Sequence, residues 1–313
     1  MTPKASLRSQ FRLSVIAQIY SQAVAIGVQI LVFPAMIILW GADKYGAWLI
    51  ISALPTYIGM ADLGFAQIAA TEMTLSVSRG DFDRAIAVNN SAWMLSCGMS
   101  ALITLALVIL CLLFSPAELF KIKAESGADV VVAIIVMGLV AVAGLIHGVV
   151  GASMRAVGLF WFFGLVRATS ILLESVALII AAYLHFSITG AACLILLCRL
   201  VIFVGSAVPI YAMYPQYMPS FRRADFRLVM SLLPSSTSFM SYSISHSLNI
   251  QGAVLIVGAQ LGPSAVVALS SIRTLTRLGR MAVTIFIPAV EPILAQLHGR
   301  GDAAGFRRVF FRL

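Results

Sequence analysis

Three arginines within one apolar stretch have the spacing of an anion-binding helix face. The stretch reads SSIRTLTRLGRM, and Arg273, Arg277 and Arg280 stand at positions i, i+4 and i+7 of it. These positions lie on one side of an α-helix. Guanidinium groups facing lipid tails would be very unfavourable, and arginine binds phosphate through two parallel hydrogen bonds. The pattern predicts contact with an anionic substrate; the alternative is a structural role, or a position near the cytoplasmic headgroups.

Acidic residues inside apolar stretches are candidates for binding a proton or a coupling ion. The stretch TYIGMADLGFAQIAATEM carries Asp62 and Glu72, which stand ten residues apart. That spacing is about 15 Å along a helix, so the two do not form a close acid–base pair. We predict that Asp62, Glu72 and Glu174 take part in ion coupling. The alternatives are a packing hydrogen bond at Asp62 and simple hydration of Glu72.

Two further stretches have polar faces. Gln18 and Gln22 share one helix face near the N-terminus, and the serine-rich stretch PSSTSFMSYSISHSLNIQ carries His246 and Asn249. Such faces have little reason to contact lipid tails, so we expect both helices to line a central cleft. Hydrogen bonding between helices is the alternative.

Other polar residues are expected to be satisfied within the first group of helices. Arg167 and Glu174 stand seven residues apart on one helix face, and Arg199 lies in the next apolar stretch. We expect these three to neutralise partners nearby. His147 is expected to be a packing residue rather than a proton carrier.

Composition places this chain in a membrane. Of 313 residues, 61% are apolar and 11% are charged, with a net charge of +9 and a mean hydropathy of +1.01. A soluble domain is about a quarter charged. The arginines are scattered among apolar stretches, so we interpret the positive charge as membrane orientation and expect no nucleic-acid partner. The four cysteines fall in apolar runs and are expected to be small buried residues, without disulfides or metal.

The apolar runs predict an all-α polytopic membrane protein with about eight transmembrane helices. A helix needs about 20 apolar residues to cross a bilayer. The first run follows a basic N-terminus and is too long for a signal peptide, so we expect it to be retained. The predicted spans are 13–40, 46–77, 86–114, 130–154, 158–184, 187–213, 227–257 and 264–296.

The loops between these spans predict the orientation. Alternate loops are rich in arginine and lysine, whereas the others hold only Lys44, Lys121 and Lys123. The positive-inside rule therefore places the N-terminus in the cytoplasm. The basic set comprises Lys4, Arg8, Arg12, Arg79, Arg84, Arg155, Arg222, Arg223, Arg227, Arg300, Arg307 and Arg308.

The start and the end of the chain share an order of features that indicates an internal repeat. Short glycine-containing turns at 40–48 and 256–266 are each followed by a helix ending in an acid and then by a basic turn. Repeats of this kind build transporters whose substrate site lies where two lobes face each other. We predict a six-helix lobe over residues 1–220 and the start of a second lobe over 221–313. The second copy stops after two helices, so we expect the chain to end inside its second lobe.

Enzyme signatures are missing from the sequence. It contains no P-loop, HExxH or GxSxG motif and no acidic cluster suited to a metal. We therefore expect a protein that is not an enzyme and that uses no cofactor and no metal.

Two segments carry a set of motifs: YGAW at 45–48, Tyr57, DLGF at 62–65, Glu72, RGD at 79–81 and IPAVEPILAQ at 287–296. With these motifs the segments resemble the polysaccharide-transporter (Wzx-type) flippases of the multidrug/oligosaccharidyl-lipid/polysaccharide exporter superfamily. The resemblance implies a MATE-like pair of six-helix lobes, alternating access, and export of a polyprenyl-diphosphate-linked oligosaccharide across the bacterial inner membrane. Lipid II flippases of the superfamily use cavity arginines for the diphosphate, a role that Arg273, Arg277 and Arg280 would fit.

The resemblance implies a role in O-antigen, exopolysaccharide or capsule biosynthesis. The expected partners are the lipid-linked oligosaccharide, membrane lipids, a coupling ion (H+ or Na+) and a polysaccharide polymerase. A cation-coupled multidrug exporter is the first alternative, although arginines favour an anionic cargo. A membrane polysaccharide polymerase or ligase is the second, although it would need a larger outer loop. A fragment or accessory protein without transport activity is the third.

Overall fold

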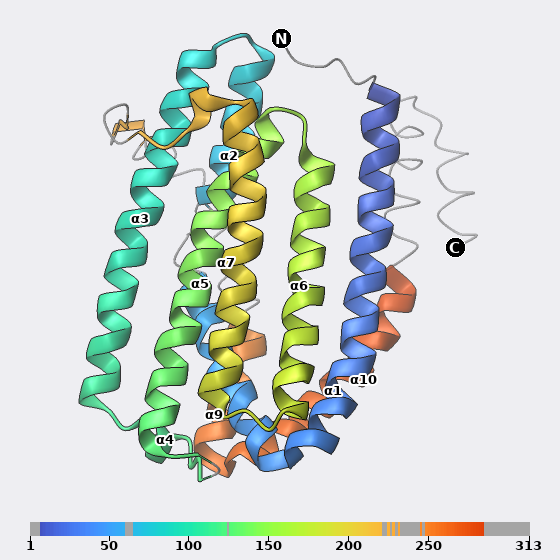
Figure 1. Ribbon diagram of the computed structural model, residues 1–313, viewed down its shortest axis with the longest axis vertical. Helices are drawn as coiled ribbons and strands as arrows, with labels where there is room; N and C mark the ends of the chain where they lie inside the picture. The colour runs from blue at the N-terminus through green and yellow to red at the C-terminus, as the bar shows by residue number, and fades with distance from the viewer. Residues whose placement is uncertain are drawn as a thin grey trace. The chain divides into compact units, whose positions relative to one another are not determined.

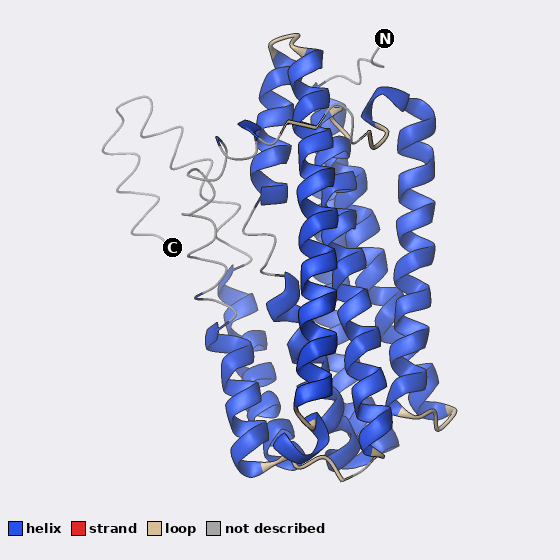
Figure 2. Cartoon of the chain, turned by 90° about the vertical axis from the view of Figure 1, so that its left-hand side faces the viewer, coloured by secondary structure: helices blue, strands red, loops and turns tan. Residues whose placement is uncertain are grey.

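The computed structural model describes most of the chain, and everything it describes is helix, turn or connecting loop (Figure 2). The described residues are 7–59, 65–123, 125–220, 224–225, 227–228, 231, 245 and 248–284. The side chains of these residues are also described, except those of 7–11, 54–59, 65 and 277–284.

Helix α1, Leu7–Gly59, contains a sharp break at Gly41. Gly41 adopts φ 74° and ψ 171°, a backbone conformation essentially restricted to glycine. The break divides α1 into two helices, as the predicted spans 13–40 and 46–77 require. The second predicted span continues into α2, Phe65–Ser78.

The next four predicted spans are confirmed as single helices (Figure 1). Capping residues fix where three of them begin: the side chains of Asp81, Ser126 and Ser187 each accept a hydrogen bond from a first-turn backbone N–H. Among the described residues, five helical stretches are long and apolar enough to cross a membrane, namely Arg12–Ala53 within α1 and the four long helices that follow. These elements are α3 Phe82–Leu113, the short α4 Pro116–Leu119, α5 Gly127–Ala156, α6 Phe160–Tyr183 and α7 Ile188–Met213.

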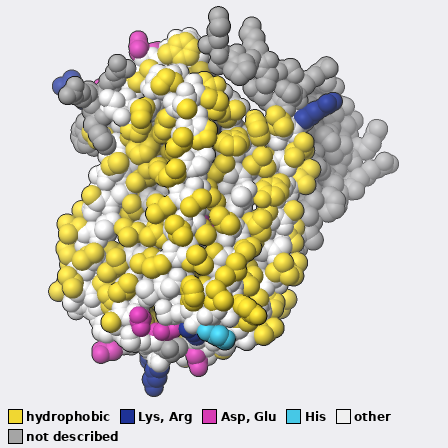
Figure 3. All heavy atoms as spheres, in the orientation of Figure 1, with side chains coloured by type: hydrophobic (Ala, Val, Ile, Leu, Met, Phe, Trp, Pro, Cys, Tyr) yellow, Lys and Arg dark blue, Asp and Glu magenta, His cyan; other side chains and the backbone are white. Residues whose placement is uncertain are grey.

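The surface fits a bilayer. One face shows a wide apolar band, with charged side chains gathered near its two ends (Figure 3). The connections after α2, α5 and α7 lie at one end of the helices. The break at Gly41 and the connections after α3 and α6 lie at the other end (Figure 1). The loops alternate as the charge pattern predicts, while the assignment of one end to the cytoplasm stays a prediction.

One expectation about the cysteines was wrong. Cys193 is exposed on α7, whereas Cys111 is buried, and Cys97 and Cys198 are half-buried. Apolarity alone does not separate the lipid-facing side of a membrane helix from its packed side, because both are apolar. All four thiols are free.

The core at the end with the basic loops lies among α2, α3, α5, the last turns of α7 and the segment that follows α7. That segment begins with the 3₁₀ turn η2, Pro215–Tyr217, whose Tyr217 side chain is only 2% exposed. Asn89 on α3 donates a 2.8 Å hydrogen bond to the Tyr217 carbonyl and accepts a 2.9 Å one from Ser153 on α5. Asn90 accepts a 2.9 Å hydrogen bond from the backbone N–H of Ser220. The buried asparagines therefore fasten the chain after α7 to the first helices.

The C-terminal described part contains the π-helical turn η4, Leu248–Gly252, then α9, Ala253–Leu261, and α10, Pro263–Thr284. The predicted spans 227–257 and 264–296 lie partly outside the described residues. The chain forms two compact units, Met1–Val267 and Ala268–Leu313. The division into lobes at residue 220 stays a prediction.

The two glycine turns of the predicted repeat have matching geometry. Gly262, between α9 and α10, adopts φ 86° and ψ 180°, close to the values at Gly41. Each of these turns joins two helices. This agreement supports the proposal of an internal duplication.

Replacing Gly262 or Gly41 with alanine should lower the free energy of unfolding by about 1–3 kcal/mol each, because a Cβ is strained in this region. The penalty is conformational, since a Cβ at Gly41 would meet nothing within 4 Å and one at Gly262 only Lys121 Cβ at 4.0 Å. Gly98→Ala in helix α3 is the matched control: it also has open space, has no positive φ, and should be neutral or stabilising. Equal unfolding midpoints in a denaturant titration for Gly262→Ala and Gly98→Ala would contradict this account.

Candidate functional site

An ion pair lies inside the first helices, between Glu174 on α6 and Arg199 on α7. Arg199 Nη2 donates a 2.9 Å hydrogen bond to Glu174 Oε2. Arg199 Nε lies 2.7 Å from Oε1, an ion pair by distance that is not aligned as a hydrogen bond. Ser170 donates a 2.8 Å hydrogen bond to the same Oε1. Both carboxylate oxygens are thus engaged, and Arg199 has the nearby partner that the sequence predicts.

Arg167 does not share this pair. It is exposed on α6 and forms no ion pair with any residue that the structure describes. Seven residues of helix separate it from Glu174 by about 10 Å of rise, so a shared face does not bring the two together.

His147 on α5 is packed and hydrogen-bonded, as predicted. Its Nε2 lies 3.0 Å from Ser206 Oγ, and the residue is 6% exposed. Its ring meets Phe163 and Phe203 edge-on, with centroids 5.6 and 6.0 Å away. These contacts account for the residue without a proton-carrying role.

Glu72 pairs with Arg84 and so joins α2 to α3. Glu72 Oε1 lies 2.7 Å from Arg84 Nη2 and accepts a 2.9 Å hydrogen bond from Nε. The pair lies beside the turn that connects these helices, at the end carrying the basic loops. Asp62, the other acid of the same predicted span, lies outside the described residues.

The predicted cleft residues are only partly described. Gln18 and Gln22 are exposed on α1, while Ala17 and Ser21 on the adjoining face pack against α6. Asn249 is exposed in η4, and His246 lies outside the described residues.

The arginine helix is confirmed as a helix. Arg273, Arg277 and Arg280 all fall within α10, so their spacing places them on one side of it. Arg273 is half-buried. The side chains of Arg277 and Arg280 lie outside the described part of the chain.

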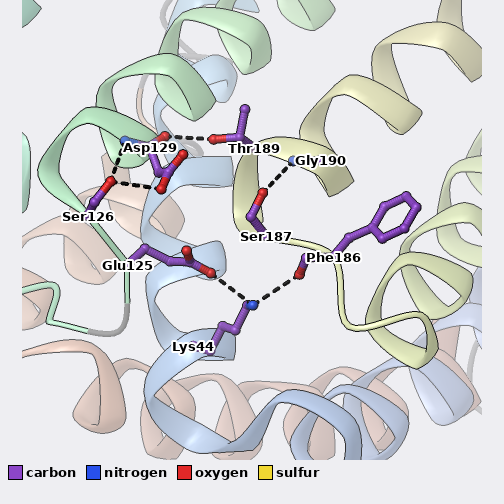
Figure 4. Close-up of polar contacts among 8 residues, drawn as sticks. All are labelled: Lys44, Glu125, Ser126, Asp129, Phe186, Ser187, Thr189 and Gly190. Carbon is purple, nitrogen blue, oxygen red and sulfur yellow. Dashed lines mark hydrogen bonds and ion pairs between the residues drawn. The ribbon is translucent and has the colours of Figure 1, made fainter.

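A lysine holds together three connections at the other end of the first helices (Figure 4). Lys44 Nζ lies 2.8 Å from Glu125 Oε1, before α5, and donates a 3.0 Å hydrogen bond to the carbonyl of Phe186, between α6 and α7. The Lys44 ammonium also lies 5.1 Å from the centroid of the Trp40 ring. Thr189 adds a 2.9 Å hydrogen bond to the Asp129 carbonyl. Sequence analysis missed this network, although the isolated charges around 43–44 and 118–129 were its signal.

At this same end, the second half of α1 packs so closely against the α9–α10 turn that an added Cβ would not fit between them. Lys121 Nζ donates a 2.8 Å hydrogen bond to the Gln260 carbonyl. A Cβ at Gly46 would collide with the backbone of Pro263, and a Cβ at Gly258 would lie 2.8 Å from the Ile50 side chain. The two buried glycines permit this close approach.

The described acids Glu72 and Glu174 are thus each paired with an arginine. Within the described ranges, no three His, Cys, Asp or Glu residues are grouped to hold a metal ion.

The fold matches two solved structures, both with low sequence identity. One is described as the inward-facing conformation of a multidrug resistance MATE family transporter of the MOP superfamily, with a TM-score of 0.65, 16% identity, and coverage of 92% of this chain and 69% of that chain. The other is the outward-facing conformation of such a transporter, with a TM-score of 0.57, 17% identity, and coverage of 95% and 72%. No protein-family model matches the sequence, and no curated protein matches it. The chain is an all-helical polytopic membrane protein with a MATE-like fold that covers part of the MATE chain.

Proposed function

We propose that this chain transports a polyprenyl-diphosphate-linked oligosaccharide across the bacterial inner membrane by alternating access. The MATE-like fold, matched over nine-tenths of the chain, supports transport rather than catalysis. The cargo would serve O-antigen, exopolysaccharide or capsule synthesis, with a polysaccharide polymerase as the expected partner. In this proposal the N-terminus is cytoplasmic.

The arginine face of α10 supports an anionic cargo. Arg273, Arg277 and Arg280 would bind the diphosphate, because guanidinium groups match phosphate oxygens in geometry and charge. Gln18, Gln22, His246 and Asn249 would contact the oligosaccharide. The lipid tail would remain in the bilayer while the polar head crosses.

The close approach near Gly46 supports a cytoplasm-facing state. If the end with Lys44 is the outer one, the contacts of Gly46 with Pro263 and of Lys121 with Gln260 close that side. Transport would then require these contacts to open and re-form in each cycle.

Coupling to a proton or Na+ is proposed for Asp62, Glu72 and Glu174. Glu72 and Glu174 already bind Arg84 and Arg199, so a proton or cation has to compete with a guanidinium there. Breaking either pair would loosen the contact between two helices, which is one way for binding to change a conformation.

Purified chain in proteoliposomes would test the cargo. We expect it to move a fluorescent polyprenyl-diphosphate oligosaccharide between leaflets, measured as a change in its accessibility to a membrane-impermeant quencher. Movement of a cationic dye without the diphosphate lipid would instead assign a multidrug exporter. Elongation of the glycan without movement would assign a polymerase or ligase.

A further inference from the structure

Two arginines near the α5–α6 turn have no role in the proposed transport site. Arg155 is the penultimate residue of α5, and Arg167 lies in the second turn of α6. Both lie at the same end of the helices, because α5 ends and α6 begins at this turn. Arginine side chains at the edge of the hydrocarbon require an anion or water to stabilise them.

The Arg155 side chain packs on an aromatic ring, but one of its N–H groups has no hydrogen-bond partner. Its guanidinium carbon lies 5.1 Å from the centroid of the Phe160 ring, which orients the side chain by a cation–π contact. The residue is half-buried, and its Nε is buried without a hydrogen-bond partner. A buried, unpaired N–H of a charged group is costly, and the outer nitrogens of this half-buried side chain are the donors that a ligand oxygen can reach.

Arg167 lies on the same face of α6 as Phe160, two helical turns further along. The next acid on that face is Glu174, whose oxygens bind Arg199 and Ser170. Neither Arg155 nor Arg167 forms an ion pair with any described residue. The pair thus presents uncompensated positive charge around the Phe160 ring.

The depth of the pair matches a lipid phosphate. Arg167 lies about 10 Å along α6 from Phe160, and α6 is about 36 Å long against a hydrocarbon thickness of about 30 Å. An arginine at that depth reaches the phosphate level by extending its side chain toward the interface. Helix α1 runs parallel to α6, since Ala17 packs beside Gly164 and Tyr20 beside Thr169. That register brings the exposed Arg12 level with the start of α6.

We propose that Arg155 and Arg167 form a binding site for the phosphate group of a membrane lipid, in the leaflet at the α5–α6 turn. The ligand is either an anionic phospholipid or the diphosphate of a polyprenyl carrier, which share this chemistry. The proposal rests on the chain spanning a membrane and not on which cargo it transports.

Native mass spectrometry of the 313-residue chain with added lipid would test the site without any transport measurement. The probes are phosphatidylglycerol, polyprenyl diphosphate and phosphate-free polyprenol. We expect Arg155→Gln with Arg167→Gln to weaken binding of a phosphate-bearing lipid about tenfold or more, because charge-assisted hydrogen bonds are lost. Arg79→Gln, at an exposed arginine of the α2–α3 turn, is the matched control and should retain binding.

The choice of lipid separates the two sources. If the double variant binds phosphatidylglycerol more weakly than wild type does, the site is a phospholipid site. If only the binding of polyprenyl diphosphate is weakened, the site is a first docking point for the carrier. Equal binding of both phosphate lipids by wild type and double variant would overturn the proposal. So would an equal loss of polyprenol binding, which indicates a general packing defect. Arg167→Gln alone, at an exposed position, keeps the test decisive if the double variant misfolds.

Discussion

Replacing Arg199 with glutamine is expected to lower the free energy of unfolding by about 3–5 kcal/mol, because it leaves the Glu174 carboxylate uncompensated among apolar helices. Replacing Glu174 with glutamine should have a similar effect, because it leaves the Arg199 guanidinium without its carboxylate partner. The two side chains are only 24% and 16% exposed, so water compensates neither well. The same pair joins α6 to α7, so its loss weakens the contact between these helices.

The double variant Arg199→Gln with Glu174→Gln should recover part of this loss, because no unpaired charge remains. Unfolding by sodium dodecyl sulfate, followed by circular dichroism, measures all three variants. Arg79→Gln is the control for losing a charge without losing an ion pair, and should stay within about 0.5 kcal/mol of wild type. Additive losses in the double variant would show that the two residues do not act as a pair.

Replacing Gly46 with leucine is expected to reduce transport by at least about tenfold. Even a Cβ at this position would overlap the Pro263 backbone, so the predicted outer end could not close as it does here. Alternating access needs both closed states, and a chain unable to close one end cannot complete the cycle. Gly27→Leu is the matched control within α1, because a Cβ at Gly27 meets nothing within 4 Å.

Thiol labelling would show whether the end has opened. Phe120 is 7% exposed and lies beside Gly258, so a Phe120→Cys reporter with the native cysteines replaced should react slowly. Adding Gly46→Leu should raise its labelling rate by a membrane-impermeant maleimide. Normal transport together with unchanged labelling would remove the contact from the mechanism.

Hydropathy predicted the first span and the third to sixth, because apolar length is all that membrane insertion requires. The second predicted span, 46–77, falls partly outside the described residues. The break at Gly41 also followed from the sequence, since a glycine between two apolar runs indicates a turn. These features are local, so one-dimensional reasoning reaches them.

Pairings between helices could not be predicted in the same way. Glu174 pairs with Arg199 and not with Arg167, because the partner of Glu174 depends on how α7 packs on α6. No motif marks Asn89 and Asn90 in the sequence, yet they bind the backbone of the segment after α7. Lys44 likewise binds Glu125 and the carbonyl of Phe186, which lie in loops more than 80 residues away in sequence. Each of these contacts depends on helix rotation, which apolar length does not encode.

The flipping rate of polyprenyl-diphosphate oligosaccharide by the Arg273→Ala, Arg277→Ala double variant in proteoliposomes tests the central claim most directly. The claim is that the charged face of α10 carries an anionic head group through the bilayer. We expect flipping to be abolished while the amount of folded protein is unchanged, and to be partly retained with lysine at both positions, because lysine keeps the charge but not the forked hydrogen bonds. Undiminished flipping by the alanine variant would contradict the account.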